Sequence, residues 1–227
     1  MKKRPLLLLI LFAAVCLTSC LREGIDTIAL PFGKIPDGVI PAEIREQFEQ
    51  YIPIYEGITP PNITGEYLVS PDVLVFTSDG NFDPGYQFAD MYIQFYDQTP
   101  SGICKYRHRQ SLSTADAPEV YVVGRDNNFT AYFIEDEIRF DDNGDTLAYC
   151  KISKIVSGTW TEHGIENYRN GFIMLEKYDP TDLLMDVNVF RVVEDGNGFS
   201  ENYNWVKSYS KDDANLPTCI DKKPALK

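Results

Sequence analysis

From residue 64 onward the sequence alternates between apolar and polar side chains, in short runs rich in Val, Ile, Tyr, Phe and Thr. An alternation of period two places successive side chains on opposite faces of a strand. Between the runs stand turn-forming pairs such as Asp79-Gly80 and Asn143-Gly144, which suit hairpins. The pattern predicts an all-β, antiparallel fold, because the chain offers no helical crossover of the kind a parallel sheet requires.

The alternation divides into nine candidate strands. A series of about eight to nine antiparallel strands with short links predicts a barrel, with a β-sandwich as the alternative. The predicted strands are 64–77, 88–97, 102–111, 119–124, 128–140, 146–160, 171–178, 186–193 and 202–209.

One short amphipathic helix is predicted ahead of the strands, over residues 41–52. Ile44, Phe48 and Ile52 recur at helical spacing, and Pro53 ends the run. The polar side of this helix is acidic rather than basic, which is unfavourable for binding to a membrane surface. We therefore expect its apolar stripe to cover the end of the barrel or sandwich.

The first twenty residues resemble the signal of bacterial lipoproteins. A basic start, Met1 to Arg4, precedes an apolar stretch and then Leu17-Thr18-Ser19-Cys20. In that family the cysteine becomes the acylated mature N-terminus. The resemblance implies a signal peptide over 1–19, a lipid on Cys20, and a location at the outer membrane or the periplasmic face of the cell envelope.

The remainder of the chain divides by composition. Residues 20–40 are rich in Gly and Pro and predict a tether between the lipid and the domain. Residues 41–210 then form a single β domain with the leading helix at 41–52, and residues 211–227 form a C-terminal tail.

The charge of the chain restricts its partners. Its 21 Lys and Arg residues stand against 34 Asp and Glu residues, a formal net charge of −13, and loss of the three basic signal residues makes this −16. Binding to nucleic acid relies on Lys and Arg that neutralise phosphates, so nucleic acid is excluded as a partner. The same balance disfavours electrostatic binding to anionic lipid, which leaves lipidated Cys20 as the contact with the membrane.

Three cysteines remain after the signal segment: Cys104, Cys150 and Cys219. They allow one disulfide among three pairings in an oxidising compartment. The alternative is that each is a buried, apolar free thiol. No spacing of Cys and His matches a structural zinc site.

Two longer stretches resemble uncharacterised Gram-negative lipoproteins with lipocalin-like barrels. They are PAEIREQFEQYIPIYEGITPPNITGEYLVSP and VSGTWTEHGIENYRNGFIMLEKYDP. Lipocalins open their first strand with Gly-x-Trp, where this chain has Gly65-Glu66-Tyr67. The resemblance implies strands wrapped around an internal pocket with one open mouth, where a small ligand binds.

The most unusual local feature is a basic run, Lys105-Tyr106-Arg107-His108-Arg109, inside an acidic chain. On a strand Lys105, Arg107 and Arg109 share one face, and Tyr106 and His108 share the other. The run is a candidate site for a carboxylate, sulfate or phosphate, because Arg binds such anions with two hydrogen bonds. The alternative is a solvated outer face.

Aromatic side chains supply further candidates for contact with a ligand. If the basic run forms a site, Tyr106 and His108 line the pocket together with Trp160, whose ring suits a sugar or an apolar group. Packing within the core is the alternative role of these rings.

No motif in the sequence indicates an enzyme or a metal site. His108 and His163 lack the partners of a catalytic triad or a zinc protease. Glu135-Asp136-Glu137 is interpreted as a solvated cluster beside a turn, and partial calcium-loop matches from Asp79 and Asp141 are interpreted as hairpin turns. We therefore predict no enzymatic activity, cofactor or metal.

These observations favour a non-enzymatic envelope protein that binds a small molecule or glycan fragment in a β-barrel. The alternative is an accessory or structural subunit of an envelope complex whose barrel is filled with side chains. The two hypotheses differ in the interior of the barrel, because only the first requires a cavity there.

Overall fold

The computed structural model describes residues 39–40 and 42–204, which belong to one compact unit spanning Phe32–Lys227. The predicted signal peptide, Cys20, most of the tether, the C-terminal tail and Cys219 lie outside these residues. Within them, no helix has the length and apolar character needed to cross a bilayer.

The described chain is all-β apart from one short helix, as the alternation predicts, and every pairing between its strands is antiparallel. The strands are β1 (Gly65–Val69), β2 (Asp72–Thr77), β3 (Gln87–Phe88), β4 (Met91–Tyr96), β5 (Ile103–Gln110), β6 (Ser113–Arg125), β7 (Asn128–Phe140), β8 (Thr146–Thr161), β9 (Gly164–Tyr178), β10 (Phe190–Asp195) and β11 (Phe199–Asn202).

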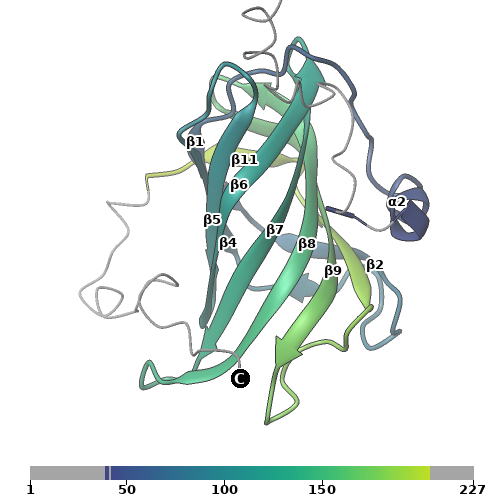
Figure 1. Cartoon of the computed structure of the whole chain (residues 1–227), viewed down its shortest axis with the longest axis vertical. Coiled ribbons are helices and arrows are strands. Elements are labelled where there is room, and N and C mark those ends of the chain that lie inside the picture. The colour runs from purple at the N-terminus through teal and green to yellow at the C-terminus, as the bar shows by residue number, and fades with distance from the viewer. Residues whose placement is uncertain (1–38, 41, 205–227) are drawn as a thin grey trace, which may run out of the picture. The chain divides into compact units, whose positions relative to one another are not determined.

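Eight of these strands close into a barrel-like ring (Figure 1). The sheet has the order β11-β1-β4-β5-β6-β7-β8-β9-β10-β2-β3, and β11 also pairs with β9. This second pairing joins the two ends of the series from β11 to β9. Because neighbours in the ring are mostly neighbours in the sequence, short hairpins connect most of them.

The prediction of nine strands is too low because two predicted runs are each divided. Pro71 has no backbone N–H, and it separates β1 from β2 within the run predicted at 64–77. The run predicted at 88–97 is interrupted at Ala89 and Asp90, which lie between β3 and β4.

Two other strands extend well beyond the predicted bounds. β6 begins at Ser113 rather than 119, because the chain continues through an irregularity of register between Asp116 and Val120. β9 begins at Gly164 rather than 171, across polar residues that local propensity does not mark as a strand. At the C-terminal side, β10 begins four residues later than the strand predicted at 186–193, and β11 shares only Asn202 with the strand predicted at 202–209.

The helix α2 (Ala42–Phe48) packs on the outer side of the ring (Figure 1). Phe48 and Ile52 lie in an apolar cluster with side chains of β7, β8, β9 and β10. Gly171 makes room for them, since a Cβ there would lie 2.6 Å from Ile52 Cδ1 and 2.8 Å from Phe48 Cδ1. The expectation that the helix covers an end of the barrel is wrong, and so is its predicted end at residue 52.

The interior of the ring has an apolar half and a polar half. In the apolar half, aromatic and aliphatic side chains are almost fully buried against one another. The largest are Tyr67, Phe95, Tyr106, Phe129, Phe133 and Tyr168. The polar half lies toward the turns that join β5 to β6, β7 to β8 and β9 to β10, and it contains the candidate site.

Candidate functional site: a charged pocket at one end of the ring

The polar half arises from a change of residue type along the inward face of single strands. On β7, the inward positions Phe129, Ala131 and Phe133 are buried and apolar, whereas the next two are Glu135 and Glu137. β5, β8 and β9 also place polar side chains on the inward face, on β8 and β9 among apolar ones. Their inward polar residues are His108, Gln110, Lys154 and Asn170.

Glu135 is the centre of a buried charged network. Its side chain is fully buried, and its Oε1 lies 2.7 Å from Nζ of Lys154. Its Oε2 lies 3.3 Å from Nδ1 of His108, whose Nε2 faces Oε2 of Glu137 at 3.9 Å. Because a buried charge is costly unless it is paired, these contacts are what allow a carboxylate at the centre of the ring.

The pKa of Glu135 reflects this environment. Burial by itself raises the pKa of a carboxyl, but the charge of Lys154 and then His108 outweigh burial and lower the pKa of Glu135 to about 2. The side chain is therefore ionised at neutral pH although water does not reach it.

Small side chains on β6 allow the network to form across three strands. Ala115 is paired with His108 on one side and with Glu137 on the other, so all three residues point to the same face. Its methyl group leaves the space through which the imidazole ring and the carboxylate approach each other. A larger residue at this position would separate them.

Asp72 adds a second buried carboxylate from the start of β2. Its Oδ2 accepts a hydrogen bond of 2.7 Å from Nε2 of Gln110, whereas its Oδ1 has no hydrogen-bond partner among the described residues. Burial raises the pKa of this carboxyl to about 6, against the opposing effects of Gln110, Lys154 and His108. Such a group is a candidate for contact with a ligand.

These residues line a cavity of about 180 Å³. Aromatic, Met and Leu side chains make up much of its apolar lining, and its polar lining residues are Asp72, His108, Gln110, Glu137, Arg139, Lys154, Asn170 and Arg191. Oδ1 of Asn170 is buried and, within the part of the chain described, has no hydrogen-bond partner. The cavity therefore presents at least two acceptor atoms, Oδ1 of Asp72 and Oδ1 of Asn170, that accept no hydrogen bond from the described residues.

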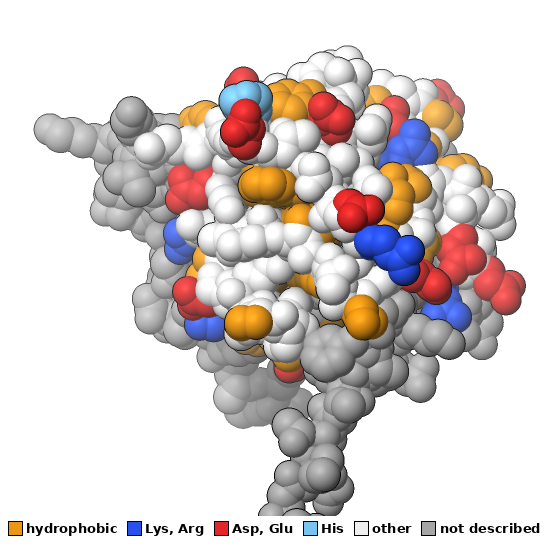
Figure 2. Space-filling view, turned by 90° about the horizontal axis from the view of Figure 1, so that it is seen from above, with side chains coloured by type: hydrophobic (Ala, Val, Ile, Leu, Met, Phe, Trp, Pro, Cys, Tyr) orange, Lys and Arg blue, Asp and Glu red, His pale blue; other side chains and the backbone are white. Residues whose placement is uncertain are grey.

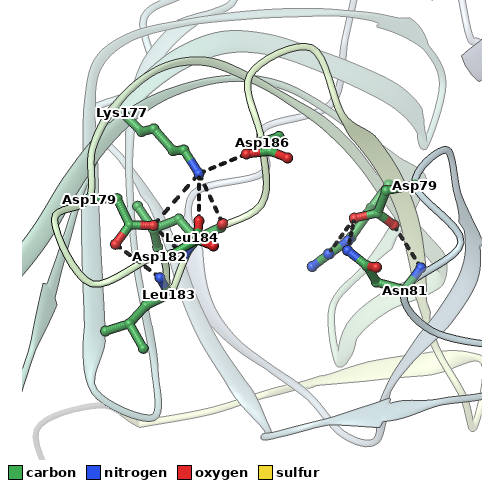
Figure 3. Close-up of polar contacts among 9 residues, drawn as sticks. Asp79, Asn81, Lys177, Asp179, Asp182, Leu183, Leu184 and Asp186 are labelled. Atoms are coloured by element: carbon green, nitrogen blue, oxygen red, sulfur yellow. Dashed lines mark hydrogen bonds and ion pairs between the residues drawn. The ribbon is translucent and has the colours of Figure 1, made fainter.

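The β9–β10 loop at the mouth of this pocket is held by ion pairs (Figure 3). Nζ of Lys177 lies 3.0 Å from Asp186, 3.6 Å from Asp182 and 3.7 Å from Asp179. Asp179 also accepts hydrogen bonds from the backbone N–H groups of Leu183 and Leu184. Since Leu184 lines the pocket, this arrangement fixes one side of its entrance.

The β2–β3 loop is fixed in a similar way. The carboxylate of Asp79 accepts hydrogen bonds from Thr77 and Asn81 and pairs with Arg191 at 3.2 Å. Arg191 lines the pocket. Asp79 therefore serves as a turn residue, as its interpretation as part of a hairpin requires, and Asp141 likewise accepts hydrogen bonds from the backbone of its own turn.

The structure divides the basic run between two faces of β5. Lys105, Arg107 and Arg109 point outward, where Nζ of Lys105 lies 2.9 Å from Asp97 and Nε of Arg107 donates to Gln94. Arg109 stands over a tyrosine ring, with 5.2 Å from its Cζ to the centre of the Tyr92 ring. The three cations thus interact with their neighbours outside the ring.

Of the inward residues of the run, only His108 lines the pocket. Tyr106 lies deeper, in the apolar half, where its ring centre is 4.6 Å from that of Phe133. Trp160 packs against the same apolar cluster near the β8–β9 turn, which is the opposite end of the ring. The candidate set proposed from sequence is therefore not brought together.

Sequence reasoning misses most of the residues that do line the pocket. The interpretation of Glu135-Asp136-Glu137 as a solvated cluster beside a turn is wrong, because these residues lie within β7 and Glu135 is fully buried. A signal was available, since Glu135 and Glu137 share the parity of Phe129 and Phe133 and so belong to the inward face. Asp72, Lys154 and Asn170 carry no comparable local signal.

Cys104 and Cys150 are both free and buried. Burial raises the pKa of the Cys104 thiol to about 12 and that of Cys150 further still. Thiols with raised pKa values are poor nucleophiles. Cys150 thus contributes to the wall of the pocket as a small apolar side chain.

The opposite end of the ring carries a mixed surface. Seen from above, acidic and basic side chains are interspersed with isolated hydrophobic ones (Figure 2). The exposed β8–β9 turn holds the second histidine, with Nε2 of His163 3.3 Å from Glu162 and both side chains about four-fifths exposed. This pair is solvated and lies apart from the pocket residues.

No protein-family model, curated protein or solved structure matches the chain. Its function is therefore inferred from the geometry of the pocket.

Proposed function

We propose that this chain is a non-enzymatic, lipid-anchored protein of the cell envelope that binds a compact small molecule in the pocket of a lipocalin-like barrel. The observation that carries the proposal is the pair of buried acceptors, Oδ1 of Asp72 and Oδ1 of Asn170, on the wall of one cavity. A buried polar atom without a partner costs about 1–3 kcal/mol. A ligand that donates hydrogen bonds to both atoms removes this cost.

The shape of the cavity restricts the ligand. Its volume of about 180 Å³ is below the range of roughly 300–1,000 Å³ typical of drug-sized ligands. An amine or a single sugar ring is compatible with this volume and supplies donor groups. The apolar side, which includes Phe88 and Phe172, accommodates the non-polar part of such a molecule.

The ligand proposed here differs in charge from the one that the basic run suggests. Lys105, Arg107 and Arg109 face away from the pocket, and acceptor atoms predominate among its buried groups without partners. A neutral ligand that donates hydrogen bonds fits the two buried acceptors, and the charged lining residues are of both signs, with Asp72 and Glu137 beside Arg139, Lys154 and Arg191. Glu135 contacts both His108 and Lys154, so its charge is already paired within the protein.

The alternative function, an accessory subunit of an envelope complex, is favoured by a different observation. Several large hydrophobic side chains near the pocket end of the ring are about half exposed and offer a surface for a protein partner. They are Tyr86, Tyr178, Leu183 and Val187. This function requires a retained protein, whereas the first requires a retained small molecule.

Native mass spectrometry of the full chain purified from its own cells tests the proposal. We expect a small-molecule adduct on the wild-type protein and its loss in Asn170→Ala. Asn127→Ala, in the exposed β6–β7 turn, is the matched control and should keep the adduct. A wild-type protein without an adduct, or equal retention by both variants, would contradict ligand binding at this site.

The lipid anchor is tested separately. Cys20→Ala should yield a protein that is neither acylated nor found in the membrane fraction. An acylated, membrane-bound variant would show that the signal has been misinterpreted.

A further inference from the structure

The polar half of the interior carries charges of both signs. Asp72 and Glu137 line the pocket, Glu135 is buried on the same face of β7 as Glu137, and Lys154 is the buried cation that contacts Glu135. Of the two arginines that also line the pocket, Arg191 pairs with Asp79, and Arg139 is partly exposed, so that solvent screens its charge.

Three side chains in this half place metal-ligating atoms close together. His108, Glu135 and Glu137 each offer one such atom, and these atoms lie within 4.8 Å of one another. Ligands bound at about 2.0–2.2 Å from one zinc ion stand about 3.3–3.6 Å apart in tetrahedral geometry. Binding of one ion by all three residues therefore requires the Glu137 side chain, which is 15% exposed, to move toward the other two.

Neighbouring side chains contact these residues and can hold them in place, as metal ligands require. Lys154 contacts Oε1 of Glu135, which leaves Oε2 on the side of His108. Carboxylates and imidazoles that bind metals are commonly held by such neighbours. In addition, Oδ1 of Asp72 is buried, lacks a partner among the described residues and lines the same pocket, where it can accept a hydrogen bond from a water bound to the ion.

We propose that His108, Glu135 and Glu137 form a binding site for a first-row divalent transition-metal ion, with its remaining coordination position open to the pocket. One imidazole and two carboxylates suit ions such as Zn²⁺ and Mn²⁺, whereas all-oxygen sites suit Ca²⁺ and Mg²⁺. The metal site goes beyond the proposed binding of an organic ligand and does not depend on it.

Titration calorimetry of the chelator-treated full chain with Zn²⁺ at neutral pH tests the site. We expect one ion per chain, and a loss of affinity of about 10-fold or more in Glu137→Gln, which removes a ligand charge while preserving shape. His163→Ala is the matched control, because His163 is the other histidine and lies beside Glu162 on an exposed turn. This variant should bind zinc like the wild type.

A spectroscopic measurement separates loss of the site from loss of the fold. Co²⁺ in place of Zn²⁺ should give visible absorption bands in the wild type that disappear in His108→Ala and persist in His163→Ala. Circular dichroism establishes that each variant remains folded, and Glu137→Gln serves as the second test if His108→Ala unfolds. No binding by the wild type, or binding lost in His163→Ala and kept in Glu137→Gln, would overturn the proposal.

The two proposals fail independently. Loss of the organic adduct in Asn170→Ala with zinc binding intact contradicts neither, and an adduct on a protein that binds no metal removes the metal site alone. A protein that binds zinc but never carries an organic molecule removes the proposed ligand and retains the metal site.

Discussion

The apolar and polar halves of the ring interior use the same strands but are stabilised differently. In the apolar half, rings such as Phe129 and Phe133 are buried against other hydrophobic side chains, and removal of each is costly by itself. In the polar half, the buried charges of Glu135 and Lys154 are tolerated because they are paired. The first half contributes mainly stability, and the second places reactive groups beside a cavity.

This difference shows that a closed ring of strands can contain a pocket in its own interior, without a second domain. Once the apolar half holds the ring closed, the remaining inward positions are free to be polar. Ala115 on β6 is paired with both His108 on β5 and Glu137 on β7. One small side chain is therefore enough to let the polar residues of its two neighbouring strands approach each other.

The largest expected effect comes from breaking the buried ion pair. Lys154→Met leaves the carboxylate of Glu135 without its closest cation, and we expect the free energy of unfolding to fall by about 3–5 kcal/mol in urea denaturation. The double variant Lys154→Met with Glu135→Leu should recover most of this loss, because both charges are then absent. A single variant within about 1 kcal/mol of the wild type would show that the pair is not buried in solution.

Asp72 should make stability depend on pH. Its pKa is raised from 3.8 in an ordinary carboxyl to about 6 by burial, so the folded protein holds this proton more tightly than the unfolded chain does. The contribution is therefore favourable at low pH, and the free energy of unfolding of the metal-free protein should fall by about 3 kcal/mol as pH rises from about 4 to above 6.

Asp72→Asn provides the control for this pH dependence. The variant keeps the shape of the side chain but cannot ionise, so its unfolding free energy should lack the decrease between pH 4 and 6 that the wild type shows. Equal pH profiles for the two proteins would mean that Asp72 is exposed to water.

A smaller effect is expected at Ala115. Ala115→Val adds two methyl groups between His108 and Glu137, and overpacking of this kind costs about 1–3 kcal/mol. Thermal unfolding measures the loss. Ala89→Val, at an exposed position between β3 and β4, is the comparison for the change in side-chain type, and it should cost less than Ala115→Val.

The smallest effect is expected on the outer face of the same strand as His108. Arg107→Ala removes an exposed cation outside the ring, and the free energy of unfolding should change by no more than about 0.5 kcal/mol. Ligand and metal binding should be unchanged. Loss of a small-molecule adduct in this variant would show that the basic run is part of the binding site.

Much of the strand arrangement could be predicted because the alternation is a local property. The bounds of β7 agree with the predicted strand at 128–140, and β5 differs from its prediction by one residue at each end. The start of β9 was missed because its first residues are polar, and their place in a strand is set by pairing with β8 and β11 rather than by their own propensity.

The candidate site was predicted only at His108. Whether Glu135 is solvated or buried depends on Lys154 and His108, which stand on other strands and come from distant parts of the sequence. The basic run stands out in an acidic chain. Its three cations, however, lie on the outer face of β5 and not in the pocket. The cavity itself is formed by side chains of eight different strands and one loop, which no local pattern specifies.

The sequence by itself determined an antiparallel all-β chain and the two faces of its strands, so that Lys105 and Arg107 point away from Tyr106 and His108. The tertiary structure decided that the ring closes through β9 and β11, that α2 lies on its flank, and that one end of the interior is charged. The physical reason is the range of each interaction. Period-two alternation acts between neighbouring residues, whereas strand closure, burial and charge pairing join residues far apart in the chain.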